Sequence, residues 1–221
     1  MGLNLDVRNK MAKRAAEEIT DGMVVNLGIG IPSLVPNHLP DTMTVMFHAE
    51  NGILGMGPTP VTGKEDGNLC NAGGYPVTVV HGASYFDSVT AFGMIRRGKI
   101  DVSILGSLQV SSRGDLANWI IPGKKVPGMG GAMELASKAN KLIVLMNHTD
   151  KSGKPKILEE CTLPLTAKKC VDLIITELAV FEIINEKLML IQHFNTTTVD
   201  EIISKTACDI LIAEKLNVID Y

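Results

Sequence analysis

The chain has 221 residues, of which 45% are hydrophobic and 20% charged, with a formal net charge of -3. These values are typical of a globular protein that buries its core without disulfides or metal. Because basic residues are scattered or paired and form no stripe, we do not expect a nucleic-acid partner. No run of about 18 apolar residues occurs, and the first residues lack the apolar segment of a secretory signal, so we expect neither a membrane protein nor an exported one.

The cysteines lie far apart and form no C-x-x-C pair, which favours reduced thiols in a cytoplasmic protein. They are Cys70, Cys161, Cys170 and Cys208. The five histidines are equally dispersed, and none has another His, Cys or acid at a familiar ligand spacing. The sequence therefore predicts no metal site.

The predicted elements alternate between strands and helices. A helix is expected over 6–20, where apolar residues recur every four positions before Asp21-Gly22, and the apolar run MVVNLG forms the first strand. Further strands are expected at 44–47, 77–80, 102–105, 142–146, 173–176 and 188–192. A second helix is expected over 85–97, ended by Gly98. This order predicts one α/β domain over 1–221, with an open, largely parallel sheet flanked by helices and ligand sites beyond the carboxyl ends of the strands.

Three glycine-rich loops are the candidates for those sites, namely 28–30, 51–57 and 128–131. The first follows a strand, yet the third glycine of a dinucleotide fingerprint would fall on Ser33. Pro32 and Pro36 also interrupt the helix that such a site needs. We therefore interpret this loop as a tight turn next to the sheet edge.

The second loop contains a lone carboxylate, Glu50, between an apolar strand and a glycine-proline segment. The Asn51-Gly52 pair favours a sharp bend that leaves this side chain facing a cleft, although a solvated loop glutamate fits the same pattern. His48 is interpreted as a packed or hydrogen-bonded histidine and His81 as a residue near the site, neither with assigned chemistry. Cys70 is expected to be a buried or half-exposed thiol.

The third loop, 127–135, runs into a predicted helix. Backbone N–H groups at the start of a helix are free to donate, and glycines leave them accessible. Such a loop suits an oxyanion hole. A glycine-rich connector without chemistry fits the pattern equally well.

Six segments keep a recognisable order and spacing along nearly the whole chain: NLGIGIP at 26–32, ENGILGMGP at 50–58, NAGG at 71–74, FDS at 86–88, ANW with PGK at 117–124, and GMGGAM at 128–133. Together they resemble the β subunit of family I coenzyme A transferases, of the acetate/acetoacetate and succinyl/3-oxoacid type. The resemblance implies the CoA-transferase fold, an open α/β sheet shared with sugar-phosphate isomerases. It also implies a cytoplasmic enzyme built from two homologous halves, of which this chain is the second.

The resemblance also assigns residues. The family's nucleophile is the glutamate of an S-E-N-G motif, which falls on Glu50, with Ala49 in place of the usual serine. Its oxyanion donors are backbone amides of the G-M-G-G-A segment, which fall on Gly131 and Ala132. Glu134 stands where aspartate is common.

The implied reaction moves CoA from an acyl-CoA donor to a 3-oxo acid or another short-chain carboxylate. Because a glutamate carboxylate is ordinarily anionic at neutral pH, it can act as the nucleophile without a general base. The scheme is ping-pong through a glutamyl-CoA thioester, so CoA is a substrate and covalent intermediate, with no tightly bound cofactor. Water must be kept from the thioester, a task for which Ile53, Leu54 and Met56 are candidates.

The resemblance further implies a homologous α subunit, in an α2β2 hetero-oligomer, without which this chain is inactive. Two alternatives stay open. One is a sugar-phosphate isomerase on the related fold, for which neither an acid-base pair nor a phosphate cradle can be assigned. The other is a non-catalytic partner subunit, which Ala49 allows. The sequence does not fix the acyl pair.

Overall fold

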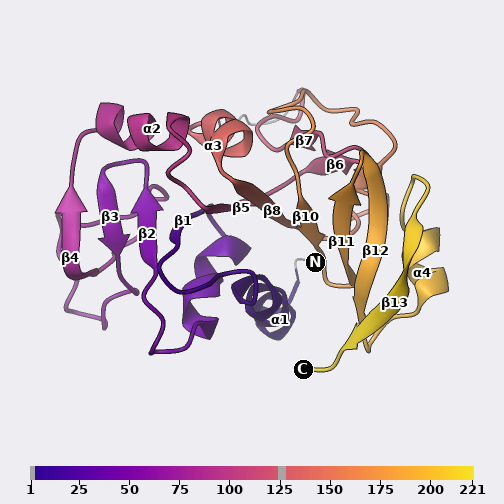
Figure 1. The fold of residues 1–221 in the computed structure, drawn as a ribbon, viewed down its shortest axis with the longest axis horizontal. Coiled ribbons are helices and arrows are strands. Elements are labelled where there is room, and N and C mark those ends of the chain that lie inside the picture. The colour runs from indigo at the N-terminus through magenta and orange to yellow at the C-terminus, as the bar shows by residue number, and fades with distance from the viewer. Residues whose placement is uncertain (1–2, 124–127) are drawn as a thin grey trace.

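The computed structural model describes residues 3–123 and 128–221 (Figure 1). Its main feature is a ten-stranded sheet in the order β13-β12-β11-β10-β8-β5-β1-β2-β3-β4. The strands of this sheet are β1 (Val24–Leu27), β2 (Met46–Ala49), β3 (Ile53–Met56), β4 (Val79–Tyr85), β5 (Val102–Gly106), β8 (Lys141–Leu145), β10 (Leu173–Ile175), β11 (Ala179–Ile184), β12 (Lys187–Phe194) and β13 (Leu211–Ile219). A three-stranded sheet consists of β6 (Gln109–Ser111), β7 (Leu116–Ala117) and β9 (Ile157–Leu158).

The five central strands, β2, β1, β5, β8 and β10, all run parallel. Antiparallel pairs add β3 and β4 on one side and β11 and β12 on the other, and β13 then pairs parallel with β12. The described helices are α1 (Leu5–Ala16), α2 (Ser88–Arg96), α3 (Ala132–Lys138), α4 (Val199–Ser204) and the 3-10 helix η1 (Ile31–His38). The predicted α/β fold, with an open, largely parallel sheet flanked by helices, is confirmed.

The sheet separates two hydrophobic cores. Along β8, Ile143 and Leu145 enter the core that contains α1, whereas Leu142 and Val144 enter the core that contains α2 and α3. This alternation follows from the two-residue repeat of a strand, and the apolar run from Leu142 to Leu145 fits a strand covered on both faces. Figure 1 shows α2 and α3 next to each other on one side of the sheet and α1 on the other.

The helix predicted over 85–97 begins later than expected. Tyr85 is the last residue of β4, and Asp87 caps α2 by accepting a 2.7 Å hydrogen bond from the Thr90 N–H. The three-residue spacing of apolar residues includes Phe86 and therefore predicts too early a start, because Phe86 lies outside the helix. The predicted stop is confirmed, since Gly98 adopts a φ of 63° and its N–H donates to the Ile95 carbonyl.

Other boundaries also differ from the prediction. The helix predicted over 6–20 ends at Ala16, although Ile19 beyond it is still buried. The strand expected at 44–47 is β2, and the strand expected at 77–80 begins only at Val79. The segment 51–57, interpreted as a loop, contains β3, because Gly55 and Gly57 obscure a short apolar strand.

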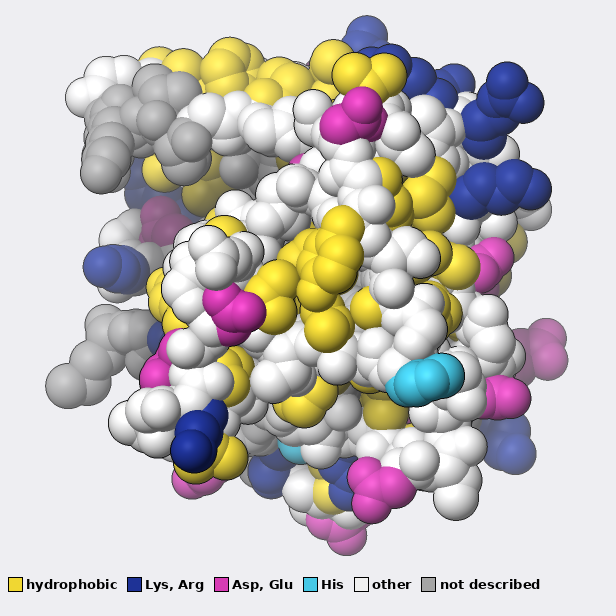
Figure 2. Space-filling model, turned by 90° about the vertical axis from the view of Figure 1, so that its left-hand side faces the viewer, with side chains coloured by type: hydrophobic (Ala, Val, Ile, Leu, Met, Phe, Trp, Pro, Cys, Tyr) yellow, Lys and Arg dark blue, Asp and Glu magenta, His cyan; other side chains and the backbone are white. Residues whose placement is uncertain are grey.

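Strand β4 forms one edge of the large sheet. Its Val80 and Tyr85 side chains are 39% and 61% exposed. Figure 2 looks onto this side of the molecule and shows hydrophobic side chains gathered near the middle of the face. No helix in the described part of the chain combines the length and the apolar character that a membrane crossing requires.

We expect a pH-dependent loss of stability from His148, which is fully buried between the hydroxyl groups of Thr176 and Thr206, 3.1 and 3.0 Å from its ring nitrogens. Burial, with the nearby Lys205 and Lys156 charges, lowers the pKa of His148 from 6.5 to about 4. Between pH 6.5 and about 4, the unfolded chain therefore binds more protons than the folded protein. The free energy of unfolding should fall by about 3 kcal/mol as the pH drops from about 6.5 to below 4.

Urea unfolding at several pH values, compared with a His148→Gln variant, checks this expectation. The variant lacks the titrating ring, so its free energy of unfolding should depend less steeply on pH between 6.5 and 4. Identical slopes in the two proteins would contradict the assignment.

Candidate active site

Glu50 lies in the tight turn that joins β2 to β3. The Gly52 N–H donates a 3.0 Å hydrogen bond to the Ala49 carbonyl and closes the turn. Gly52 has a φ of 121°, and a Cβ at this position would lie 2.2 Å from the Phe86 carbonyl oxygen. Only glycine fits there, so the turn has one geometry and holds Glu50 at the end of β2.

A neighbouring turn supports this one. The Asn51 side-chain N–H donates to the Cys70 carbonyl at 2.8 Å, and the Asn71 side-chain oxygen accepts from the N–H groups of Gly73 and Tyr75 at 2.9 and 3.0 Å. The NAGG segment thus forms a compact turn beside Glu50. Cys70 is exposed, not buried or half-exposed as predicted, although its Sγ lies 4.0 Å from the Asn51 side-chain nitrogen.

A cavity of about 810 Å³ opens beside Glu50. It is lined by residues at the carboxyl ends of β1, β2 and β5, by the 71–77 segment and by the loop before α3. The three predicted glycine-rich loops therefore meet at one site, as expected for a parallel sheet. Among the lining residues that the structure describes, Glu50 carries the only carboxylate.

Gly131 lies directly against Glu50. A Cβ on Gly131 would be 3.4 Å from the Glu50 Cγ and 3.3 Å from the Phe92 Cζ, so the Glu50 side chain and the Phe92 ring both border the space where a side chain at position 131 would lie. The Ala132 N–H donates to the Met129 carbonyl at 3.1 Å, whereas no acceptor for the Gly131 N–H occurs among the described residues. Of the two amides that the resemblance suggests, this geometry favours Gly131.

His48 and Asn26 form a buried pair under the cavity. The Asn26 side-chain N–H donates to the His48 carbonyl at 3.0 Å and lies 3.3 Å from its Nδ1, while the ring stacks on Phe86 with centroids 6.1 Å apart. Burial lowers the pKa of His48, so the ring is neutral at pH 7. The interpretation of His48 as a packed, hydrogen-bonded histidine is confirmed.

The first glycine-rich loop leads into the 3-10 helix η1, which contains Pro32 and Pro36. A dinucleotide site would need an α-helix at this place. Its predicted place at the sheet edge is wrong, because β1 lies between β2 and β5 in the middle of the sheet. The Gly28 N–H donates to the Ile104 carbonyl at 2.8 Å, which brings the loop close to β5.

Several other predicted residues lie differently. Of the three apolar residues expected to exclude water, Met56 lines the cavity, whereas Ile53 and Leu54 do not. His81 is exposed on β4 and does not line it. Lys124, in the PGK segment, is outside the described residues. In the described ranges, no cluster of three or more His, Cys, Asp and Glu side chains could hold a metal ion.

The cavity wall contains neutral amide groups from Asn26, Asn37, Asn71 and Asn118, and reasoning from the sequence missed them. The Asn118 side-chain N–H donates to the Gly106 carbonyl at 3.1 Å, and the Thr166 hydroxyl donates to its oxygen at 2.6 Å. The presence of Asn26, Asn71 and Asn118 inside the motifs NLGIGIP, NAGG and ANW was the one signal that could have found those three. A carboxylate among neutral amides, close to a glycine backbone, can attack a carbonyl carbon, and a backbone N–H of such a glycine can donate to the resulting oxyanion.

Comparison with known proteins places this chain in a family. A family model described as "Coenzyme A transferase" matches residues 8–205. The chain is 62% identical over 212 residues to the beta subunit of a probable coenzyme A transferase of Bacillus subtilis, and the match covers 96% of this chain and 98% of that protein. It is 50% identical over 217 residues to the human "Succinyl-CoA:3-ketoacid coenzyme A transferase 2, mitochondrial", over 97% of this chain but 42% of the human protein.

Solved structures share the fold. An acyl-CoA transferase of Escherichia coli, YdiF, superimposes with a TM-score of 0.78 at 21% identity, over 100% of this chain and 44% of that one. The decarboxylase AibA/AibB superimposes with a TM-score of 0.70 at 21% identity, over 98% of this chain and 90% of that one. These two likenesses concern the fold alone. The family match and the close sequence relatives decide the class of enzyme: the chain belongs to the coenzyme A transferase family.

Proposed function

We propose that this chain is the catalytic β subunit of a CoA transferase in which Glu50 forms a covalent thioester with CoA. The observation that supports this role is the position of Glu50, the only carboxylate in the described cavity wall, against the backbone of Gly131. The tight turn holds the backbone of Glu50 in place, and the carboxylate oxygens accept no hydrogen bond from the described residues. Such a group is free to attack a bound carbonyl.

In the first half-reaction a Glu50 oxygen attacks the thioester carbonyl of the donor. The C–S bond breaks, CoA leaves as a thiolate, and an acyl-glutamyl anhydride forms. The thiolate then attacks the Glu50 carbonyl carbon, the anhydride C–O bond breaks, and the donor acid leaves from a Glu50–CoA thioester. An acceptor carboxylate reverses both steps and departs as the new acyl-CoA.

Each tetrahedral intermediate carries an oxyanion, for which the Gly131 N–H is the proposed donor, with Ala132 the second candidate. No proton has to be removed from either carboxylate nucleophile, so a neutral His48 is compatible with the scheme. The absence of a polar side chain at position 49 is also compatible, because Ala49 is 3% exposed and packs with Ile53 and Val77. The replacement of serine there does not argue for a non-catalytic subunit.

The proposed acceptors are 3-oxo acids or other short-chain carboxylates, as the relatives named succinyl-CoA:3-ketoacid CoA transferases suggest. The proposed partner is a homologous α subunit in a cytoplasmic hetero-oligomer with two copies of each chain. Two Bacillus subtilis relatives are named as single subunits of a CoA transferase, and the human relative is more than twice as long as the matched region. A sugar-phosphate isomerase is less suited, because the described cavity wall contains no Lys or Arg to bind a phosphate.

Mass spectrometry of the complex with its α subunit tests this function. After addition of an acyl-CoA, the peptide that contains Glu50 should gain the mass of CoA with loss of water, and added acceptor carboxylate should remove the adduct. The peptide that contains Glu65, a glutamate in an exposed loop, serves as the internal control. If no acyl-CoA produces an adduct on Glu50, the proposed mechanism is wrong.

A further inference from the structure

We propose that Arg96 is a positioning residue: by binding Glu134 it joins α2 to α3 and keeps Gly131 against Glu50. This inference rests on the proposed function and concerns how the nucleophile and the oxyanion donor keep their distance. The two groups come from distant parts of the chain, the β2–β3 turn and the loop before α3. Phe86, just before α2, contacts the turn, and Phe92 within α2 lies next to Gly131.

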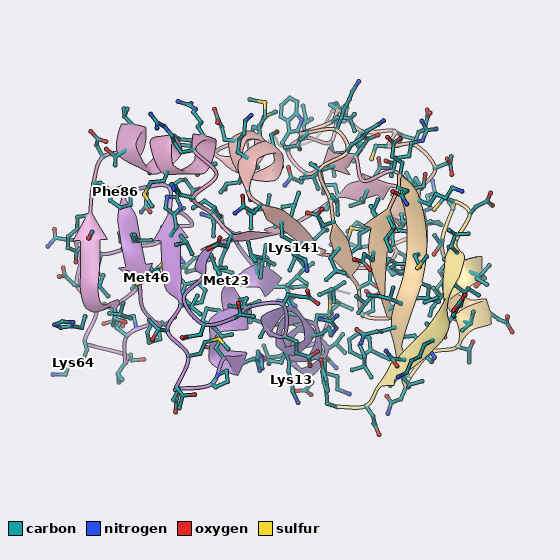
Figure 3. All side chains as sticks on the ribbon, in the orientation of Figure 1. Lys13, Met23, Met46, Lys64, Phe86 and Lys141 are labelled. Carbon is teal, nitrogen blue, oxygen red and sulfur yellow. The ribbon has the colours of Figure 1, made fainter. Side chains whose placement is uncertain are left out.

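The start of α2 is attached to the turn that carries Glu50. Phe86, directly before the cap of this helix, donates its N–H to the Gly52 carbonyl at 3.1 Å. Its ring also stacks on His48, two residues before Glu50. Figure 3 shows Phe86 where β4 ends beside α2. The turn and the start of α2 therefore move as one unit.

The end of α2 is attached to α3. The Arg96 Nε lies 3.0 Å from both carboxylate oxygens of Glu134, and its Nη2 lies 2.8 Å from one of them. This fork has a defined direction, unlike a contact through a single nitrogen. Glu134 is in the first turn of α3, three residues after Gly131, so the ion pair fixes the helix end from which the Gly131 loop emerges.

Phe92 completes the connection in the middle of α2. Its ring lies 3.3 Å from the position that a Cβ on Gly131 would occupy, and the Arg96 guanidinium is 5.9 Å from the ring centroid. Arg96 thus lies close to the side chain that supports Gly131 and is bound to the helix that follows it. If α3 moved away from α2, Gly131 would lose its support and its distance from Glu50 would change.

The exposure of the pair separates this role from a role in folding. The Arg96 and Glu134 side chains are 59% and 25% exposed, and exposed ion pairs contribute little to stability. The hydrogen bond and charge of Arg96 lower the pKa of Glu134, so the pair stays ionised at neutral pH.

The test uses the complex with the α subunit and the variants Arg96→Gln, Arg96→Lys, Glu134→Gln and the charge-reversed double variant Arg96→Glu/Glu134→Arg. The steady-state constants, the rate of adduct formation on Glu50 and the melting temperature are measured for each. We expect loss of the ion pair to displace the Gly131 N–H by up to about 1 Å. This should lower kcat and the rate of adduct formation about ten-fold, with KM changed less than about two-fold. Lysine should restore part of kcat, and the double variant most of it.

Lys169→Gln is the matched control, because it removes an exposed ion pair, with Glu186, that lies 2.6 Å apart and away from the cavity. Unchanged kcat in all the Arg96 and Glu134 variants, in a complex whose unsubstituted form makes the adduct, would overturn this inference and leave the proposed function intact. The inference would also be overturned if kcat fell only in proportion to a fall in the melting temperature and the double variant recovered neither. If the unsubstituted complex forms no adduct on Glu50, both the proposed function and this inference are wrong.

Discussion

Replacement of Glu50 by alanine is expected to lower kcat for CoA transfer by about four orders of magnitude or more, because the variant lacks the atom that forms the covalent intermediate. Glu50→Gln should be equally inactive, since it keeps the shape and removes the charged nucleophile. The side chain is half-buried and accepts no hydrogen bond from the described residues, so the melting temperature should change little. Steady-state assays and thermal unfolding of the complex measure both effects.

Glu65→Ala is the control for the Glu50 variants. Glu65 is exposed and accepts a 2.8 Å hydrogen bond from the Gly63 N–H within its own loop, away from the described cavity wall. Its removal should leave kcat unchanged. More than about one per cent of the normal kcat in Glu50→Ala, in a correctly assembled complex, would contradict a covalent role for Glu50.

Gly131→Ala is expected to lower kcat about a hundred-fold. The added methyl group would lie 3.4 Å from the Glu50 Cγ and 3.3 Å from the Phe92 ring, and the ring contact is tighter than side chains normally make. Either the carboxylate or the ring must move, and the N–H of residue 131 then no longer meets the oxyanion. Because the ring and the carboxylate can each shift by a few tenths of an ångström, folding should survive.

The matched control is Gly93→Ala in α2, where no atom lies within 4 Å of the added methyl group and φ is not positive. Alanine favours a helix, so this variant should be slightly more stable, by about 0.5–1 kcal/mol, with unchanged kcat. The adduct on the Glu50 peptide, followed over time after acyl-CoA addition, distinguishes slow formation in Gly131→Ala from complete loss. A normal rate of adduct formation would exclude a role for the Gly131 backbone.

The fold was largely predictable because its central strands are short apolar runs with β-branched residues. The end of α2 was predictable too, because Gly98 readily adopts the positive φ that ends a helix. The parts that were missed depend on long-range contacts. Strand β3 pairs with β2 and β4 even though Gly55 within it and Gly57 directly after it give the segment the composition of a loop. Phe86 fits the spacing of a helix, yet its backbone bonds to Gly52.

The candidate site was only partly predictable, for a related reason. Periodicity and composition leave Glu50 as one loop carboxylate among several, and the family resemblance alone distinguished it. The resemblance did not indicate that Phe92 supports Gly131, or that Glu134 reaches Arg96, because these contacts join residues far apart in sequence. Local rules also could not show that the Ala132 amide is already engaged.

The turn after β2 has a final consequence for the variation that this chain can accept. Connections at protein surfaces commonly absorb inserted or deleted residues at low cost. The turn that holds Glu50 has no spare length, since one bond closes it and Gly52 fits against the Phe86 carbonyl without room for a side chain. One inserted residue would either open the turn or shift β3 against its neighbours, turning its buried side chains outward. Unlike most surface connections, this one should therefore keep a constant length wherever Glu50 has to meet Gly131.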